Sequence, residues 1–125
     1  WEILPQAGYV APPDRGSNHN RGGAVDVTLV DMRGQEKEMP TEFDDFTEQA
    51  WQATTEGLSV PQIQNKTMLR TAMTDAGFSA IRKEWWHYNG PGYRRYSENI
   101  DIPLDASYKR MPMPVSWRSA RLSRN

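Results

Sequence analysis

Residues 59–77 constrain the fold most, because the start, the apolar face and the end of a helix are all recognisable there. Ser59-Val60-Pro61-Gln62 fits a capping box with proline inside the first turn, and Gly77 supplies a stop. The apolar residues between these ends recur at helical spacing and form one stripe: Met68, Leu69, Ala72, Met73 and Ala76. We therefore predict an amphipathic helix whose stripe, methionines included, packs in the core.

A strand is predicted upstream of this helix. Residues 24–31 alternate between apolar and polar side chains, so Val25, Val27 and Leu29 are expected to face the core. Asp26 then projects from the opposite face of the same strand.

Weaker signals predict the remaining elements. Thr41 is placed to cap a first helix in which Phe43, Phe46 and Ala50 recur at helical spacing. Residues 78–89 are rich in aromatic residues and favour a second strand. We further expect loop over most of residues 1–23, a turn at 33–35 and a short edge strand at 100–104.

Composition limits the function classes. The chain has 125 residues, of which 37% are hydrophobic, so it forms one small domain or a piece of a larger protein. A formal net charge of −1 does not support general nucleic-acid binding, and no apolar run approaches the roughly 18 residues of a membrane span. The absence of cysteine excludes disulfides and thiolate ligands, and it leaves the redox compartment undecided.

Two regions are expected from the chain's ends. The chain begins at Trp1 without a methionine or a signal sequence, so we expect residues 1–108 to be the C-terminal part of a longer enzyme. Residues 109–125 carry five basic side chains and no acid, which indicates a solvated tail; binding to an anionic surface is the alternative.

Both histidines of the chain lie near carboxylates. His19 precedes Asp26 by seven residues, with Gly22 and Gly23 between them, which favours a loop ligand followed by a strand ligand. His87 follows Glu84 by three, and on an ideal strand these two would point to opposite faces. If they serve one site, a bulge, a twist or the end of the strand must bring them together.

These four residues form a sound inventory for a metal site. Two imidazoles and one carboxylate suit Zn²⁺ with an open fourth position, and a spare glutamate is a candidate general base. The alternative is that His19 is an ordinary loop residue and His87 a hydrogen-bonded core residue. Spacing alone leaves both interpretations open.

Read together, the two motifs resemble the signature of a known family. Ser17-x-His19-x-x-Gly22-x-Ala24-x-Asp26 and Glu84-x-Trp86-His87 are similar to the two-part signature of zinc D-Ala-D-Ala peptidases, which share a metal-site fold with the Hedgehog signalling domain. Gly8-Tyr9-Val10, Phe43-Asp44-Asp45-Phe46 and Glu84-Trp85-Trp86-His87-Tyr88 most resemble D-alanyl-D-alanine dipeptidases of the vancomycin-resistance type. The resemblance covers roughly residues 6–104.

The resemblance implies a fold and a set of roles. It implies an α+β fold in which a small antiparallel sheet carries the zinc site and packs with helices. It further implies one zinc ion per chain on His19, Asp26 and His87, with Glu84 as catalytic base. Ser17 and Asp44 match positions that contact the dipeptide substrate. Arg21 is expected to act structurally, and Trp85 and Trp86 either wall the site or pack as core.

One part of the family pattern is missing. The family places a catalytic arginine upstream, in a Tyr-Arg-Pro segment that this chain does not contain. We therefore expect the missing N-terminal part to be a partner of this domain, and expect hydrolysis to be slower without it by about 10²–10³. Rival functions are a D,D-carboxypeptidase on peptidoglycan stem peptides, a non-catalytic zinc-containing binding module and a metal-free fold. The compartment, bacterial cytoplasm or periplasm, is not decided.

Overall fold

The computed structural model describes residue 11 and residues 16–99; the edge strand predicted at 100–104 and the basic tail at 109–125 lie outside them. In chain order the elements are β1 (Ala24–Asp26), the 3-10 turn η1 (Glu48–Ala50), helix α1 (Val60–Asp75), β2 (Ser79–Ala80), β3 (His87–Asn89) and the 3-10 turn η2 (Tyr93–Arg95).

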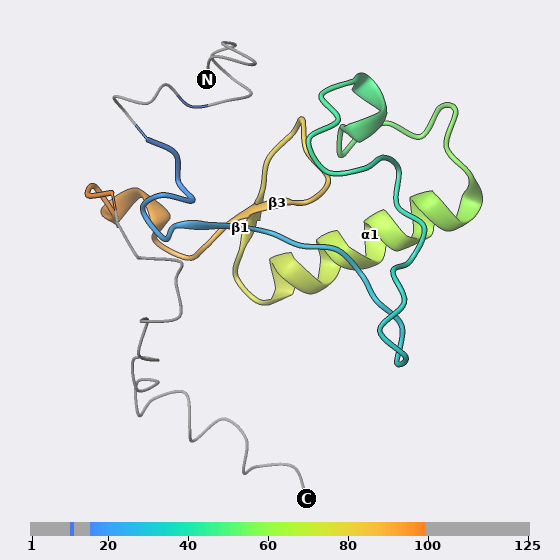
Figure 1. The fold of residues 1–125 in the computed structure, drawn as a ribbon, viewed down its shortest axis with the longest axis horizontal. Coiled ribbons are helices and arrows are strands. Elements are labelled where there is room, and N and C mark those ends of the chain that lie inside the picture. Colours follow the sequence, from blue (N-terminus) through green and yellow to red (C-terminus); the bar gives the residue numbers. More distant parts are fainter. Residues whose placement is uncertain (1–10, 12–15, 100–125) are drawn as a thin grey trace, which may run out of the picture.

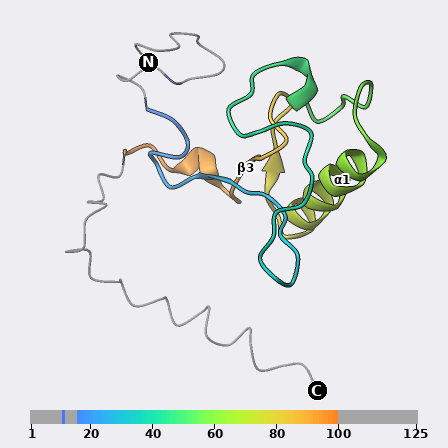
Figure 2. The ribbon, with the colours of Figure 1, turned by 45° about the vertical axis from the view of Figure 1, so that its right-hand side comes forward.

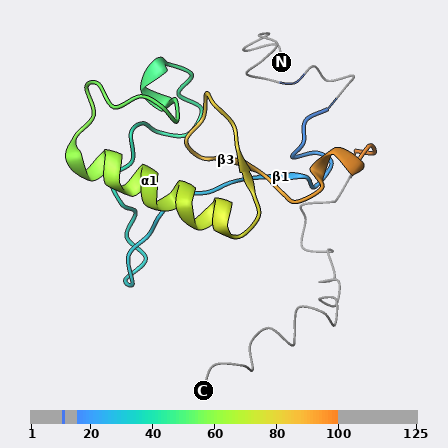
Figure 3. The ribbon, with the colours of Figure 1, turned by 180° about the vertical axis from the view of Figure 1, so that it is seen from behind.

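The strands form one antiparallel sheet in the order β1-β3-β2. Figures 1 and 3 show α1 on one side of the sheet and η2, in orange, on the opposite side. Figure 2 shows the same arrangement of the helix and the 3-10 turn from an intermediate direction. The arrangement fits the expected α+β class, with a single α-helix among the described residues. No helix in the described part of the chain is both long and apolar enough to cross a membrane.

Helix α1 begins and ends where the sequence predicts. The Ser59 hydroxyl accepts from the Gln62 backbone N–H at 3.2 Å, and the Gln62 side chain accepts from the Ser59 N–H at 2.8 Å, which completes the capping box. Gly77 follows the helix with φ +88°, a left-handed conformation that glycine adopts without strain. The local signals at both ends are therefore confirmed.

The buried face of α1 differs from the predicted stripe. Leu69 is 4% exposed and Met73 packs against the core, whereas Met68 is 61% exposed and both alanines of the stripe lie at the surface. Lys66 is buried instead, at 3% exposure, with its ammonium donating to the carbonyls of Trp51 at 3.1 Å and Thr54 at 2.5 Å. A lysine stem is apolar, so this side chain covers hydrophobic surface while its head reaches backbone oxygens.

Both predicted strands are shorter than expected. β1 ends at Asp26 because its partner β3 begins at His87; one more bond, from Val27 N–H to the Trp86 carbonyl at 3.0 Å, closes the pairing. The predicted core face is partly wrong, since Val25 is 40% exposed while Val27 and Leu29 pack against the core. Residues 78–89 form two short strands separated by an irregular segment.

The turn predicted at residues 33–35 is confirmed. Gly34 has φ +81° and donates to the Asp31 carbonyl at 3.0 Å. The Asp31 carboxylate accepts from the backbone N–H groups of Arg33 and Gln35 at 2.8 and 2.9 Å. These hydrogen bonds stabilise the anion and lower the pKa of Asp31, with Gln35 contributing most.

The helix predicted to start at Thr41 is wrong: the only helical turn there is η1. Asp44 has φ +60°, which no helix tolerates. The Thr41 hydroxyl accepts from the Trp85 indole N–H at 2.9 Å, and Phe43 stacks on the Trp85 ring at 5.4 Å between centroids. Contacts with the aromatic core therefore override a weak local helix signal.

The core is small and aromatic. The buried hydrophobic residues in the described part of the chain are Ala50, Leu69, Trp85, Trp86 and Tyr88. The two tryptophan rings meet edge to face at 5.3 Å, a favourable aromatic geometry. Of the two roles expected for Trp85 and Trp86, packing as core is confirmed, and both directly precede the candidate ligand His87 in the chain.

We predict that Leu69→Ala lowers the free energy of unfolding by about 2–4 kcal/mol, because it opens a cavity in the core cluster that also contains the tryptophans. The matched change one residue earlier, Met68→Ala, is expected to alter it by no more than about 0.5 kcal/mol, because that side chain lies in solvent. Urea denaturation followed by tryptophan fluorescence measures both. A larger loss for Met68→Ala than for Leu69→Ala would contradict the assignment of the buried face.

Candidate metal centre

Strand pairing brings the first two candidate ligands together. In the antiparallel register of β1 and β3, Asp26 lies opposite His87. Side chains of such a pair project from the same face of the sheet. The Asp26 Oδ1 atom lies 3.3 Å from His87 Nδ1.

The third candidate, His19, comes from the loop before β1. This loop folds back on itself through hydrogen bonds from Gly22 N–H to the His19 carbonyl at 2.9 Å and from Gly23 N–H to the Asn18 carbonyl at 2.7 Å. Gly22 has φ +67°, which makes the tight reversal possible. As a result, His19 Nε2 lies 3.0 Å from His87 Nδ1 and 3.4 Å from Asp26 Oδ1.

His19, Asp26 and His87 can hold a metal ion, since their ligand atoms all lie within 4.8 Å of one another. The side chains of His19 and Asp26 are each 38% exposed and that of His87 is 11% exposed, so the cluster is open to solvent on one side. Burial lowers the pKa of His87, and its hydrogen bond to Asn89 opposes that shift. A neutral imidazole is the form that binds metals.

Glu84 lies beside this cluster, 7% exposed, with Oε2 at 3.6 Å from His87 Nδ1. The two residues meet because β3 begins at His87, which leaves Glu84 in the irregular segment before it. Glu84 and His87 can therefore share one site although they are three residues apart, because the strand starts after Glu84. Burial, reinforced by the carboxylates of Asp26 and Asp44, raises the pKa of Glu84 to about 7.

Gln52 supports the segment that carries Glu84. Its side-chain amide donates to the carbonyls of Glu84 at 3.1 Å and Trp85 at 3.4 Å, and its backbone N–H donates to the Arg82 carbonyl at 2.9 Å. Lys66 holds the same loop from α1 through the Trp51 and Thr54 carbonyls. The helix, the loop and the Glu84 segment are thus linked by partly buried hydrogen bonds.

The two predicted substrate contacts are placed differently. Asp44 is exposed and close enough to Glu84 for its charge to raise that residue's pKa. Ser17 is half-buried, and its hydroxyl donates to Asn20 Oδ1 at 2.8 Å, so it takes part in the loop that carries His19.

The sequence reasoning missed the polar residues around the site. Asn89 is 5% exposed, and its Oδ1 lies 3.3 Å from His87 Nε2 and accepts from Asn18 at 2.7 Å. The sequence pattern is sufficient to find Asn89, because residues i and i+2 on a strand share a face and His87 is a candidate ligand. Gln52 was not, because its partners are backbone carbonyls more than 30 residues away.

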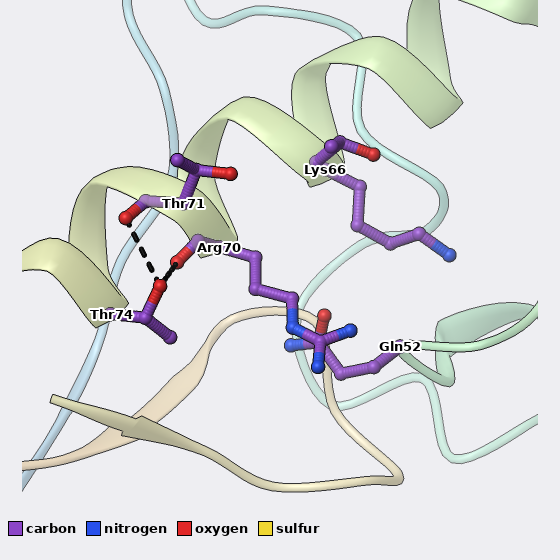
Figure 4. Close-up of a pocket in the computed structure, with 6 residues that line it drawn as sticks. Gln52, Lys66, Arg70, Thr71 and Thr74 are labelled. Carbon is purple, nitrogen blue, oxygen red and sulfur yellow. Dashed lines mark hydrogen bonds between the residues drawn. The ribbon is translucent and has the colours of Figure 1, made fainter.

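A cavity of about 280 Å³ lies away from this cluster. Figure 4 shows Arg70 reaching from α1 toward Gln52, with Lys66 beside it on the same helix. Threonines complete the lining: Thr67, Thr71 and Thr74. None of its lining residues belongs to the histidine–aspartate cluster, so the candidate centre remains at the β1–β3 face.

Comparison with known proteins identifies the family. The family model described as D-ala-D-ala dipeptidase matches residues 5–105. A D-alanyl-D-alanine dipeptidase of Escherichia coli (strain K12) is 35% identical over 96 residues, which cover 77% of this chain and 49% of the relative. One of Enterococcus faecium is 40% identical over 82 residues, 65% of this chain and 39% of the relative. The chain thus spans half or less of the length of these relatives.

We predict that Gln52→Leu lowers the free energy of unfolding by about 1–3 kcal/mol, because two backbone carbonyls lose a partly buried donor while the side-chain volume stays similar. Gln49→Leu, three residues earlier and exposed, should change it by no more than about 0.5 kcal/mol. Denaturant titration of the two variants side by side makes the comparison. Equal effects would show that the amide of Gln52 does not hold the Glu84 segment.

Proposed function

Because the chain belongs to the D-Ala-D-Ala dipeptidase family, we propose that His19, Asp26 and His87 bind one zinc ion and that the site hydrolyses the dipeptide D-Ala-D-Ala in peptidoglycan precursor metabolism. The observation that carries the proposal is the convergence of three zinc-type donors beside a buried glutamate, whose Oε2 lies 3.6 Å from His87 Nδ1. The zinc coordination, the role of Glu84 as general base and the dipeptide substrate are all proposals for this chain.

The donor spacing supports zinc. A tetrahedral ion with bonds of about 2.0–2.1 Å places its ligand atoms about 3.3 Å apart. The three donor–donor distances are 3.0, 3.3 and 3.4 Å. Two neutral imidazoles and one carboxylate also match the ligand types of catalytic zinc sites, which keep a fourth position open.

The proposed chemistry divides between the metal and the glutamate. When bound, zinc supplies a Lewis acid that polarises the scissile carbonyl and acidifies water to a pKa of about 7. Glu84 accepts a proton from the attacking water as the oxygen bonds to the carbonyl carbon. It then delivers that proton to the leaving nitrogen as the C–N bond breaks, which releases two molecules of D-Ala.

The polar groups around Glu84 suggest how the dipeptide is oriented. We propose that Asp44, exposed and within electrostatic range of Glu84, pairs with the ammonium group of the substrate. Ser17, at the start of the loop that carries His19, is proposed as a second contact. Glu84 and the two tryptophans that follow it in the chain are buried, and a charged interaction is stronger where water is excluded.

We predict that the chain binds one zinc ion and that Asp26→Asn weakens binding by more than the roughly 10–100-fold typical of losing an outer-shell partner. Asp31→Asn, the same charge change five residues along, leaves the affinity unchanged, because Asp31 bonds its own turn. Competition with a chelator and elemental analysis give both affinity and stoichiometry. Equal zinc affinity for the two variants would refute the ligand assignment.

We predict that Glu84→Gln lowers the rate of D-Ala release by about 10²–10⁴ while zinc remains bound, because the variant cannot accept a proton. Glu56→Gln, on an exposed loop, serves as the matched control and keeps the parent rate. Unchanged hydrolysis in Glu84→Gln would remove the glutamate from the mechanism. Parallel assays with a stem pentapeptide identify a D,D-carboxypeptidase if that substrate is cleaved faster than the free dipeptide.

A further inference from the structure

A chain of side-chain hydrogen bonds runs from Arg21 to the metal-facing histidine. The Arg21 guanidinium donates to Asn18 Oδ1 at 3.2 Å, and Asn18 Nδ2 donates to Asn89 Oδ1 at 2.7 Å. Asn89 Oδ1 also lies 3.3 Å from Nε2 of His87, the nitrogen on the far side of the ring from the cluster. Four residues from a loop and a strand are thus connected in series.

The backbone places these groups with little freedom. Asn89 and His87 are two apart on β3, so both project from one face, and Asn89 lies opposite Ala24 in the register. The backbone carbonyl of Asn18 accepts from the N–H of Gly23, the residue before β1, at 2.7 Å. This hydrogen bond fixes the loop to the start of the strand. Gly23 is buried, and a Cβ there would approach the Tyr93 Cβ to 3.2 Å, so a side chain would crowd this junction.

The direction of every hydrogen bond in the series follows from its first member. A guanidinium has no acceptor, so Asn18 turns its oxygen toward Arg21 and its NH₂ toward Asn89. Asn89 must then present an oxygen, and that oxygen can pair with His87 only if Nε2 carries the hydrogen. His87 Nδ1 is consequently left without a hydrogen, and its lone pair faces His19 Nε2 at 3.0 Å and Asp26 Oδ1 at 3.3 Å.

We propose that Arg21, Asn18 and Asn89 are positioning residues that fix the tautomer and ring orientation of His87 so that Nδ1 is available to a metal. This inference extends the proposed function, because it explains how one ligand is prepared. Polar partners of this kind raise ligand basicity and commonly contribute 10–100-fold to metal affinity.

The substitution Asn18→Asp tests the direction of the series with almost no change in shape. An aspartate at this position pairs with Arg21 but can only accept from Asn89. The Asn89 amide is then expected to turn over and donate to His87 Nε2, which moves the hydrogen of the ring to Nδ1. In Asn20→Asp, a matched control in the same loop, the new carboxylate still accepts from Ser17, so the tautomer is unchanged.

Long-range ¹H–¹⁵N spectra of the metal-free 125-residue chain identify the tautomer directly. We expect the Nε2–H form of His87 in the parent and in Asn20→Asp, and the Nδ1–H form in Asn18→Asp. Circular dichroism confirms that each variant is folded, and Asn18→Ala, which removes the link without reversing it, provides a second variant. The Nε2–H form at unchanged population in both position-18 variants overturns the proposal.

Zinc affinity is the second readout. Asn18→Asp should bind zinc about 10–100-fold more weakly than Asn20→Asp, although both add the same negative charge near the site. Equal affinities would contradict the role in metal binding. If neither the parent nor any variant binds zinc, the proposed function fails. The tautomer of the metal-free chain still shows whether Asn18 and Asn89 orient His87.

Discussion

The site depends on the antiparallel pairing of β1 with β3. This pairing involves three residues on each strand, and it sets Asp26 directly opposite His87. A shift of one residue would move Asp26 to the other face and separate the two side chains. The loop with His19 precedes β1 immediately, so its position follows from the same pairing. All three candidate ligands therefore rest on one short ladder.

The ladder is too short to be stable by itself, and the aromatic core supports it. Two- and three-residue strands need a packed face, which Trp85, Trp86 and Tyr88 provide next to His87. Hydrogen bonds from Gln52 hold the segment before β3, and Lys66 holds the Gln52 loop against α1. The polar site and the apolar core thus share one stretch of chain, residues 84–89. A change in core packing should therefore shift the positions of the candidate ligands.

The parts of the structure that the sequence predicted were those set by local chemistry. The capping box at Ser59 and the glycine at 77 determine the ends of α1. The two histidine motifs, at residues 17–26 and 84–87, contain all three members of the histidine–aspartate cluster. The failures are tertiary. The Thr41 hydroxyl accepts from Trp85 instead of capping a helix. The loop with Trp51 and Thr54 packs on α1 at Lys66, which is buried, while Met68 is exposed. Hydrogen bonds between distant polar side chains, such as that of Asn18 with Asn89, leave no periodic pattern to detect.

The central claim, that His19 and His87 share one metal ion with Asp26, is tested most directly by X-ray absorption at the zinc edge of the loaded chain. The sequence contains two histidines and no cysteine, so the number of imidazoles counts both candidate ligands at once. The account predicts two imidazoles per zinc in a first shell of nitrogen and oxygen at about 2.0–2.1 Å. A first shell with one imidazole or none would contradict it.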